Sequence, residues 1–570
     1  MSRVTRLSAV LRRARLIPIV ALLQDYPKTW LRPDLIAGLV LATMLVPQGM
    51  AYAELTGLPA VTGIYTTIAA LVAYSTFGPN RRLILGPDSS LAPVIAAVIL
   101  PLASGDASTA VVLASAMSII AGLVCIAAGY LHLGVITELL SKPIRIGYLN
   151  GIAVLIFVSQ LPKALGFSVD GDSTVEVLVE SFRRVLDGDT VTAALVISLG
   201  SVAVIVGLRT VSKSIPGVVV AAVGSIGAVS LLDLAQRGVS TVGEIPAGLP
   251  PLTLPGIGLD VLPALIVGAV AVALVSFADT GALSTATALK SGEHVDPNDE
   301  IKALGIANLV SGVFQGFPTS ASSSRTAVAI AVGGRSQLAG LIAAAGVVLI
   351  IFVIPGLVSE MPAPTLAAIV ITASFTLFDW SGTRWLLRVR RSEFLLTLGA
   401  FLGVLLLGVL EGIGVAILLS LANFVRRAWR PHSTELGRVE GLPGYHDRER
   451  HPEAIVVPGL LIIRYDAPIF FANAPDFGRR LQELLRGAGR PIERVLVVGN
   501  AITDIDSTGV EILGDVLDDL DAKQVDFAFA GLKGLVKDRL RSYGLYERIG
   551  EDHFFPNTIS AVSFHEKQPG

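Results

Sequence analysis

The sequence has few charged residues and almost no cysteine. Aspartate, glutamate, lysine and arginine make up only 16% of the 570 residues, whereas hydrophobic residues make up 52%. A soluble globular protein needs about 25% charged residues to cover its surface, so much of this chain must face lipid. The single cysteine, Cys125, excludes internal disulfides and cysteine-based metal sites. The net charge of −2 gives no electrostatic basis for binding nucleic acid.

Motifs for catalysis are also missing. The sequence contains no P-loop, nucleophilic triad or metal-ligand cluster, and its seven histidines are scattered without ligand spacing. We therefore expect no enzyme activity, no metal and no bound cofactor. We expect no secretory signal at the N-terminus, because the apolar stretch that ends near Gln24 is not followed by a small-residue cleavage site. Residues 1–33 are predicted to form a cytoplasmic N-terminal segment.

Apolar segments of membrane-spanning length are abundant. A spanning helix needs about 20 apolar residues, and residues 34–430 are predicted to form a transmembrane domain of fourteen such segments. The predicted segments cover residues 34–53, 58–77, 86–101, 109–131, 145–161, 190–208, 214–232, 260–284, 298–314, 321–333, 337–356, 362–378, 392–409 and 411–425. They divide into two sets of seven.

The basic residues between these segments indicate the orientation. Cytoplasmic loops of membrane proteins are enriched in lysine and arginine. With a cytoplasmic N-terminus, thirteen basic residues fall in inside loops and four in outside loops. The inside set is Arg81, Arg82, Lys142, Arg145, Arg209, Lys213, Lys290, Lys302, Arg335, Arg384, Arg388, Arg390 and Arg391. We therefore predict a multi-pass protein of the cell (inner) membrane with both termini in the cytoplasm.

Two short segments at matching places suggest a binding site. Because each set has an odd number of helices, similar halves would be inserted in opposite senses, and such inverted repeats are typical of secondary transporters. The third segment of each set is short and begins with Gly, Pro and Ser residues, at 86–90 and at 317–325. Short Gly/Pro-interrupted segments in corresponding positions indicate a site near the middle of the membrane.

The residues at these two helix starts suit an anion. A free helix N-terminus offers unpaired N–H groups and a partial positive charge. Hydroxyl groups that can donate to an oxyanion belong to Ser89, Ser90, Ser322, Ser323 and Ser324. The alternative is that these serines only cap their helices. Gln48 and Tyr52 lie on successive turns of the first predicted helix and can face the same cavity.

Two charged residues lie inside predicted spans. Arg325 would cost about 2.5–3.5 kcal/mol in a lipid environment, so we expect it to face a polar cavity and attract an anion, or to form a structural ion pair with Asp88 or Asp279. Asp279 can exchange a proton or ligate Na⁺ and so couple ion movement to substrate movement. The alternative for Asp279 is a hydrogen bond that packs two helices.

The chain becomes polar after Phe424. Residues 431–457 are predicted to be a linker, and residues 458–570 a small α/β domain, because β runs alternate there with amphipathic helices. Within residues 504–509, Ser507 and Thr508 lie at the start of a predicted helix. They are candidates for phosphorylation, and an ordinary helix cap is the alternative.

Five stretches resemble the SulP anion transporters (solute carrier family 26) and their attached STAS domain. Residues 45–53 (LVPQGMAYA) are similar to the signature of the family, and residues 307–312 (ANLVSG) and 322–328 (SSSRTAV) to its ninth and tenth helices. Residues 465–473 (YDAPIFFAN) and 504–509 (DIDSTG) resemble the STAS domain. The resemblance implies a 7+7 inverted repeat with UraA-like core and gate domains, a homodimer, an elevator-like mechanism and an anion site between helices 3 and 10.

The resemblance also implies roles for single residues. Gln48 and Tyr52 match helix-1 positions near the substrate, and Ser324 with Arg325 matches the Ser-Arg pair of helix 10. Asp279 matches the helix-8 acid that is linked to Na⁺ or H⁺ coupling. Na⁺-coupled bicarbonate members have a threonine one turn after this acid, where the present chain has Leu283. This difference favours H⁺ coupling.

Taken with the residues, the resemblance predicts a secondary active transporter of small anions, most simply sulfate or a related oxyanion, working by H⁺ symport in the lipid membrane. Three alternatives stay open: a Na⁺-coupled bicarbonate transporter, an H⁺-coupled dicarboxylate transporter, and an anion channel or sensor that signals through the STAS domain. A protein partner at the STAS domain is also left open.

Overall fold

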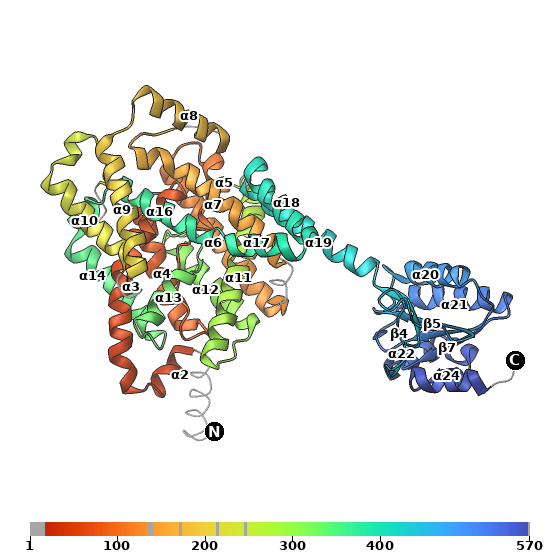
Figure 1. Cartoon of the computed structure of the whole chain (residues 1–570). Helices are drawn as coiled ribbons and strands as arrows, with labels where there is room; N and C mark the ends of the chain where they lie inside the picture. Colours follow the sequence, from red (N-terminus) through yellow and green to blue (C-terminus); the bar gives the residue numbers. More distant parts are fainter. Residues whose placement is uncertain (1–17, 135–140, 170–173, 212–215, 244–247, 568–570) are drawn as a thin grey trace, which may run out of the picture. The chain divides into compact units, whose positions relative to one another are not determined.

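The computed structural model describes residues 18–134, 141–169, 174–211, 216–243 and 248–567. Contacts divide the chain into two compact units, Met1–Ser420 and Leu421–Gly570. The first unit consists mainly of helices, and the second contains a mixed sheet (Figure 1). Residues 1–17 of the predicted N-terminal segment lie outside the described residues.

Each of the fourteen predicted segments overlaps one helix. These helices are α3 (Leu31–Leu55), α4 (Ala60–Phe77), α5 (Ala92–Ala103), α6 (Ala107–Tyr130), α7 (Lys142–Leu165), α9 (Thr192–Val211), α10 (Gly217–Leu231), α11 (Leu262–Ser291), α12 (Pro297–Val313), α13 (Ser323–Ala331), α14 (Leu338–Val353), α16 (Ala363–Leu377), α18 (Arg391–Leu407) and α19 (Val409–Trp429). Among the described residues, eight helical segments are long and apolar enough to cross a membrane. The helices α5, α10 and α14 are apolar but shorter.

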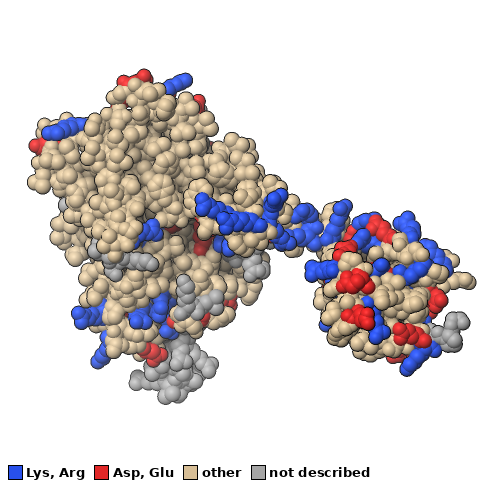
Figure 2. Space-filling model, in the orientation of Figure 1, with Lys and Arg blue, Asp and Glu red and all other residues tan. Residues whose placement is uncertain are grey.

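Short helices lie between the longer ones. They are α2 (Pro18–Gln24), η1 (Lys28–Trp30), α8 (Thr174–Asp187), η3 (Leu234–Arg237), α15 (Pro355–Ser359) and α17 (Trp380–Val389). Both α8 and α17 carry apolar side chains that are exposed, such as Phe182 and Trp385. Figure 2 shows that most of the visible surface of the helical unit has no charged side chains, as expected for a surface that faces lipid.

Glycines allow the helices of the first unit to approach closely. A Cβ on Gly63 of α4 would lie 1.8 Å from the Gly49 oxygen of α3, and a Cβ on Gly147 of α7 would lie 2.0 Å from the Thr397 oxygen of α18. Membrane helices associate through such small residues because lipid provides no hydrophobic force between them. The helices form two groups: α3–α6 with α11–α14, and α7, α9, α10 and α16 with α18.

Two short strands join the two halves of the first group. Strand β1 (Leu85–Gly86) pairs antiparallel with β2 (Ser320–Ala321). Helix α13 starts two residues after β2, but α5 starts only at Ala92, six residues later than the predicted segment. Strand β1 is extended because it pairs with β2, Pro87 disfavours helical backbone in the residue before it, and a turn follows. The two helix N-termini therefore lie next to the same strand pair.

The second unit is built on one six-stranded sheet. Its strands are ordered β4-β3-β5-β6-β7-β8, and β5 to β8 run parallel. They are β3 (Ser433–Gly437), β4 (His446–Asp447), β5 (Gly459–Tyr465), β6 (Ile492–Val498), β7 (Asp526–Ala530) and β8 (Phe554–Phe555). The helices are α20 (Ala474–Gly487), α21 (Ser507–Ala522), α22 (Gly534–Ser542), α23 (Leu545–Ile549) and α24 (Thr558–Lys567), with η4 (Glu551–His553). Alternate strand residues pack into two cores, one with α20–α23 and one with α24.

The predicted linker 431–457 contributes two of these strands. Strand β3 could not be predicted from the sequence, because Ser-Thr-Glu-Leu-Gly is polar and does not alternate apolar and polar residues. Glu435 is nevertheless buried, since its carboxylate pairs with Arg448 and, at 2.6 Å, with Arg490. Ion pairing thus allows a polar segment to form an inner strand of the sheet.

Candidate functional site

A cavity of about 730 Å³ lies within the helical unit. Its walls come from α3, from the turn between β1 and α5, and from α7, α9, α10, α11, α13 and α16. Eight of the predicted site residues line it: Gln48, Tyr52, Ser89, Ser90, Asp279, Ser322, Ser323 and Ser324. Their convergence follows from the β1–β2 pairing, which brings the starts of α5 and α13 together.

Hydrogen-bond donors face this cavity. The hydroxyls of Ser322 and Ser324 lie 3.0 Å apart, and Ser323 is exposed to the open space. The Gln48 side chain is only 7% exposed, yet its Oε1 has no hydrogen-bond partner among the described residues. Buried polar atoms are rarely left without a partner. Gln48 Oε1 is therefore an acceptor that can receive a hydrogen bond from a bound molecule, and it is not itself a donor to an anion.

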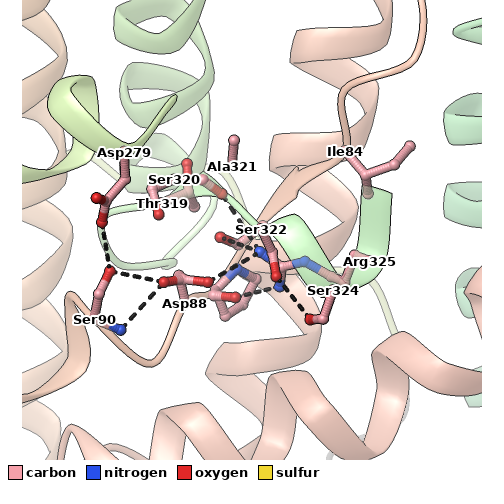
Figure 3. A network of polar contacts seen from close by, with 12 residues as sticks. Ile84, Asp88, Ser90, Asp279, Thr319, Ser320, Ala321, Ser322, Ser324 and Arg325 are labelled. Carbon is pink, nitrogen blue, oxygen red and sulfur yellow. Dashed lines mark hydrogen bonds and ion pairs between the residues drawn. The ribbon is translucent and has the colours of Figure 1, made fainter. Parts of the chain in front are cut away.

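A chain of contacts links the two acidic residues of the cavity through one serine (Figure 3). Ser90 Oγ lies 2.7 Å from Asp88 Oδ2 and 3.1 Å from Asp279 Oδ2. The backbone around Asp279 is fixed, because Thr280 Oγ1 accepts a 3.1 Å hydrogen bond from the Ala321 N–H. Asp88 does not act as the N-cap of α5, whose N-cap is Leu91 without a side-chain hydrogen bond.

Arg325 is not among the residues that line the cavity, and its guanidinium lies within the network of polar contacts around Asp88 and Ser320 (Figure 3). The side chain is 1% exposed, and its Nη1 donates to the Pro87 carbonyl. Its Nη2 donates to Gly86 at 3.3 Å and to Ser320 at 3.4 Å, and lies 3.8 Å from Asp88 Oδ1. The guanidinium therefore joins the two strands β1 and β2 to each other and balances the charge of Asp88.

Three other basic residues line the cavity: Lys142 and Arg145 of α7, and Arg209 of α9. The sequence predicted them only as cations of inside loops. Their position near the ends of apolar segments placed them at the membrane boundary, but nothing local shows which of them turns toward the cavity. A third acid, Asp379, also lines it and caps α17 by accepting from the Gly382 N–H at 2.7 Å.

No group of three or more His, Cys, Asp or Glu side chains that could hold a metal ion occurs in the described part of the chain. The donors of the cavity are instead hydroxyls, an amide and guanidinium groups, which suit an anion.

The predicted phosphorylation site lies at the start of α21 in the second unit. The N-cap is Asp506, which accepts from the N–H groups of Gly509 and Phe471, both at 2.8 Å. Capping is thus performed by Asp506, while Ser507 is exposed and Thr508 half-buried. Phosphorylation of either hydroxyl stays a prediction.

The fold and the cavity define a class of protein. A helical membrane unit in which two short helices begin at one strand pair beside a polar cavity is typical of secondary transporters. A family model described as the sulfate permease family matches residues 31–400, and a STAS domain model matches residues 451–561. The chain belongs to the sulfate permease family and carries a STAS domain, as the sequence motifs predicted.

Curated relatives support this assignment. A probable sulfate transporter of Mycobacterium tuberculosis (strain CDC 1551 / Oshkosh) is 38% identical over 96% of this chain and 97% of its own length. Human solute carrier family 26 member 6 is 34% identical over 82% of this chain and 64% of its own length. Chloroplastic sulfate transporter 4.1 of Arabidopsis thaliana is 29% identical over 93% of this chain and 79% of its own length.

Solved structures confirm the predicted fold class. The inward-facing structure of the murine solute carrier 26 family member A9 anion transporter matches with a TM-score of 0.89 at 21% identity, covering 97% of this chain and 94% of that chain. The transmembrane domain of the cyanobacterial bicarbonate transporter BicA matches with a TM-score of 0.60 at 25% identity, covering 69% of this chain and 98% of that domain. The protein is therefore a multi-pass membrane protein of an anion transporter family.

Proposed function

We propose that the protein is a secondary active transporter that carries sulfate or a related oxyanion together with H⁺ across the inner membrane. The observation that carries this proposal is the cavity at which α5 and α13 begin. It places the hydroxyls of the predicted serines at the starts of two helices, with the Gln48 side chain in the same lining. Helix N-termini and hydroxyl donors stabilise oxyanions. Several of the curated relatives are named as sulfate transporters.

The Ser90 contacts support the part of the proposal that concerns H⁺. A serine hydroxyl carries one hydrogen, so Ser90 cannot donate to Asp88 and Asp279 at the same time. A proton on Asp279 resolves this conflict, because Asp279 can then donate to Ser90 Oγ while Ser90 donates to Asp88. The same proton removes a negative charge from the cavity wall. Proton binding and anion binding then favour each other, which is the requirement for symport.

Sodium is less well supported as the coupling ion. Na⁺ is a hard cation and, like the other hard cations, needs several oxygen ligands. One turn after Asp279 the cavity is lined by Leu283, which offers no oxygen. Bicarbonate therefore stays the second candidate substrate with Na⁺, favoured only by the likeness to the BicA transmembrane domain.

The two helix groups suggest how the site moves. Gln48, Ser90, Asp279 and the serines of α13 belong to the group α3–α6 with α11–α14, whereas other walls of the cavity belong to α7, α9 and α16. We propose that the first group slides as a core domain against the second as a gate, carrying the anion in an elevator-like motion. Both termini are proposed to be cytoplasmic, and the working form a homodimer.

Uptake into sealed proteoliposomes tests this function. Radiolabelled sulfate, bicarbonate and fumarate are offered with an inward H⁺ gradient or an inward Na⁺ gradient, each imposed alone. We expect sulfate to accumulate with the H⁺ gradient only. Accumulation of bicarbonate driven by Na⁺ would support the second candidate. An anion conductance without accumulation would identify a channel and refute symport.

A carboxylate variant tests the role of Asp279. In Asp279→Asn the side chain can no longer exchange a proton, so sulfate should equilibrate but not accumulate in response to the H⁺ gradient. The matched control is Asp260→Asn, an exposed carboxylate that does not line the cavity. Persistent H⁺-driven accumulation in Asp279→Asn would remove Asp279 from the coupling.

A further inference from the structure

The first turns of α7 form a rigid wall of the cavity. Helix α7 packs closely on α18 because Gly147 has no side chain, and a Cβ there would lie 2.0 Å from the Thr397 oxygen. Thr397 Oγ1 also donates to the Pro143 carbonyl at 2.8 Å. The side chains of Ile144 and Ile146 are buried. The backbone of residues 143–147 is therefore held in place independently of the helices that carry the serines.

Arg145 is a cation of this wall whose guanidinium forms no direct hydrogen bond or ion pair in the described part of the chain, although Asp279 is near enough to interact with it electrostatically. It is half-buried and lines the cavity. Arg325 is different, because its guanidinium is occupied by three carbonyl oxygens and by Asp88. Among the other basic residues of the cavity, Arg209 is exposed, and the exposed Lys142 lies 5.4 Å from the centre of the Trp385 ring.

Tyr148 supplies a second, independent observation. It lies three residues after Arg145, and residues at this spacing share one face of a helix. Leu149, on the same face, lines the cavity, whereas Tyr148 itself is not among the lining residues. The Tyr148 side chain is only 4% exposed, and its hydroxyl has no hydrogen-bond partner among the described residues. A buried hydroxyl without a partner is uncommon and points to a group that binds there.

The charges of the other cavity residues leave Arg145 available. Asp88 faces Arg325 and accepts from Ser90, and Asp379 caps α17. Asp279 contacts Ser90 and also interacts electrostatically with Arg145, although no hydrogen bond or ion pair joins Asp279 to Arg145 in the described part of the chain. With Lys142 and Arg209, these are the charged groups that line the cavity. Arg145 is the one cation among these groups that is half-buried and whose side chain forms no hydrogen bond or ion pair in the described part of the chain.

We propose that Arg145, together with the neighbouring hydroxyl of Tyr148, forms a second oxyanion-binding wall of the cavity on α7. The guanidinium fork binds two oxygens of an oxyanion at once, and the phenol donates one further hydrogen bond. This inference rests on the proposed transport function and deepens it. Because a guanidinium interacts more strongly with two negative charges than with one, the wall favours a divalent oxyanion such as sulfate over bicarbonate.

Binding of radiolabelled sulfate to the purified full-length protein tests this wall. Arg145→Gln should raise the Kd about tenfold or more, which corresponds to about 1.4 kcal/mol for each factor of ten. Arg145→Lys should lie between wild type and Arg145→Gln, because an ammonium keeps the charge without the fork. Tyr148→Phe should raise the Kd about threefold to tenfold. The Kd for bicarbonate, measured by its competition with labelled sulfate, should change less than the Kd for sulfate in each variant.

Lys142→Gln is the matched control, since it removes a cavity cation whose ammonium already lies over an aromatic ring. We expect its Kd to rise less than about threefold. An equal rise of the Kd for sulfate in Lys142→Gln and Arg145→Gln would mean that any positive charge of the cavity has the same effect, and it would overturn the assignment. An unchanged Kd in both Arg145→Gln and Tyr148→Phe would overturn it as well.

Melting temperatures separate binding from folding. If Arg145→Gln unfolds, the Kd values of Arg145→Lys and Tyr148→Phe decide the question, because both keep the size of the side chain. The two hypotheses also fail differently. A wild-type protein that neither binds nor accumulates any of the anions refutes the transport function. Normal transport by wild type with unaffected α7 variants refutes only the second wall.

Discussion

Replacement of Arg325 by methionine distinguishes two roles of its guanidinium. It acts either as a structural clamp, which holds β1 and β2 together, or as a direct ligand of the anion. The structure places the guanidinium 3.8 Å from Asp88 Oδ1, with both side chains largely buried. At an effective dielectric constant of about 20, two unit charges at this separation attract by about 4 kcal/mol. Breaking a buried pair by removing one partner costs about 3–5 kcal/mol. Arg325→Met should therefore lower the melting temperature by several degrees.

The double variant Arg325→Met/Asp88→Asn isolates the charge effect. With Asp88 neutral, no uncompensated charge is left, so this variant should recover about half of the lost stability. The recovery should be incomplete, because the carbonyls of Gly86, Pro87 and Ser320 have lost their donor in both variants. Asp88→Asn alone completes the double-mutant cycle, which also comprises wild type, Arg325→Met and the double variant.

The assay is thermal unfolding of the purified protein in detergent, followed for all four proteins, together with sulfate binding. If Arg325→Met melts within about 1 °C of wild type but no longer binds sulfate, the clamp is refuted and Arg325 contacts the anion directly. If it melts early and the double variant recovers both stability and binding, Arg325 acts by holding β1 and β2 together.

Three further predictions concern packing, the tail and pH. Gly63→Ala places a Cβ 1.8 Å from a backbone oxygen of α3, so α4 must shift at a cost of about 1–3 kcal/mol. Uptake and melting temperature should therefore fall. The control Gly200→Ala, which has open space around it, should change neither. Deletion of residues 440–570 should alter the rate or abundance of the transporter, and a changed order of preferred anions in uptake assays would contradict a purely regulatory tail. Burial raises the pKa of Asp447, but hydrogen bonds, first from His432, lower it by more, to about 2 from the usual 3.8. Its contribution to stability is therefore present above pH 4 and is lost as the pH falls toward 2, and in Asp447→Asn hydrogen exchange of the sheet should lose this acid dependence.

The positions of the membrane helices could be predicted from the sequence because hydrophobic length is a local property. Each of the fourteen predicted segments overlaps a helix, and the two short segments at 86–101 and 321–333 lie at the site. The boundary of α5 was less accurate, because pairing of β1 with β2 competes with the helix and depends on a strand more than 200 residues away. The same limit applies to β3, whose burial depends on Arg490.

The sequence by itself determined that this is a membrane protein with a separate polar domain, and it located the serines, Gln48 and Asp279 that meet at one cavity. Only the tertiary structure decided what each charge does. Whether a buried arginine faces a cavity or backbone carbonyls depends on the direction of its side chain and on distant partners, so Arg325 proved to bridge β1 and β2. For the same reason Arg145 was visible in the sequence only as a loop cation. Its position on a cavity wall follows from the packing of α7 on α18.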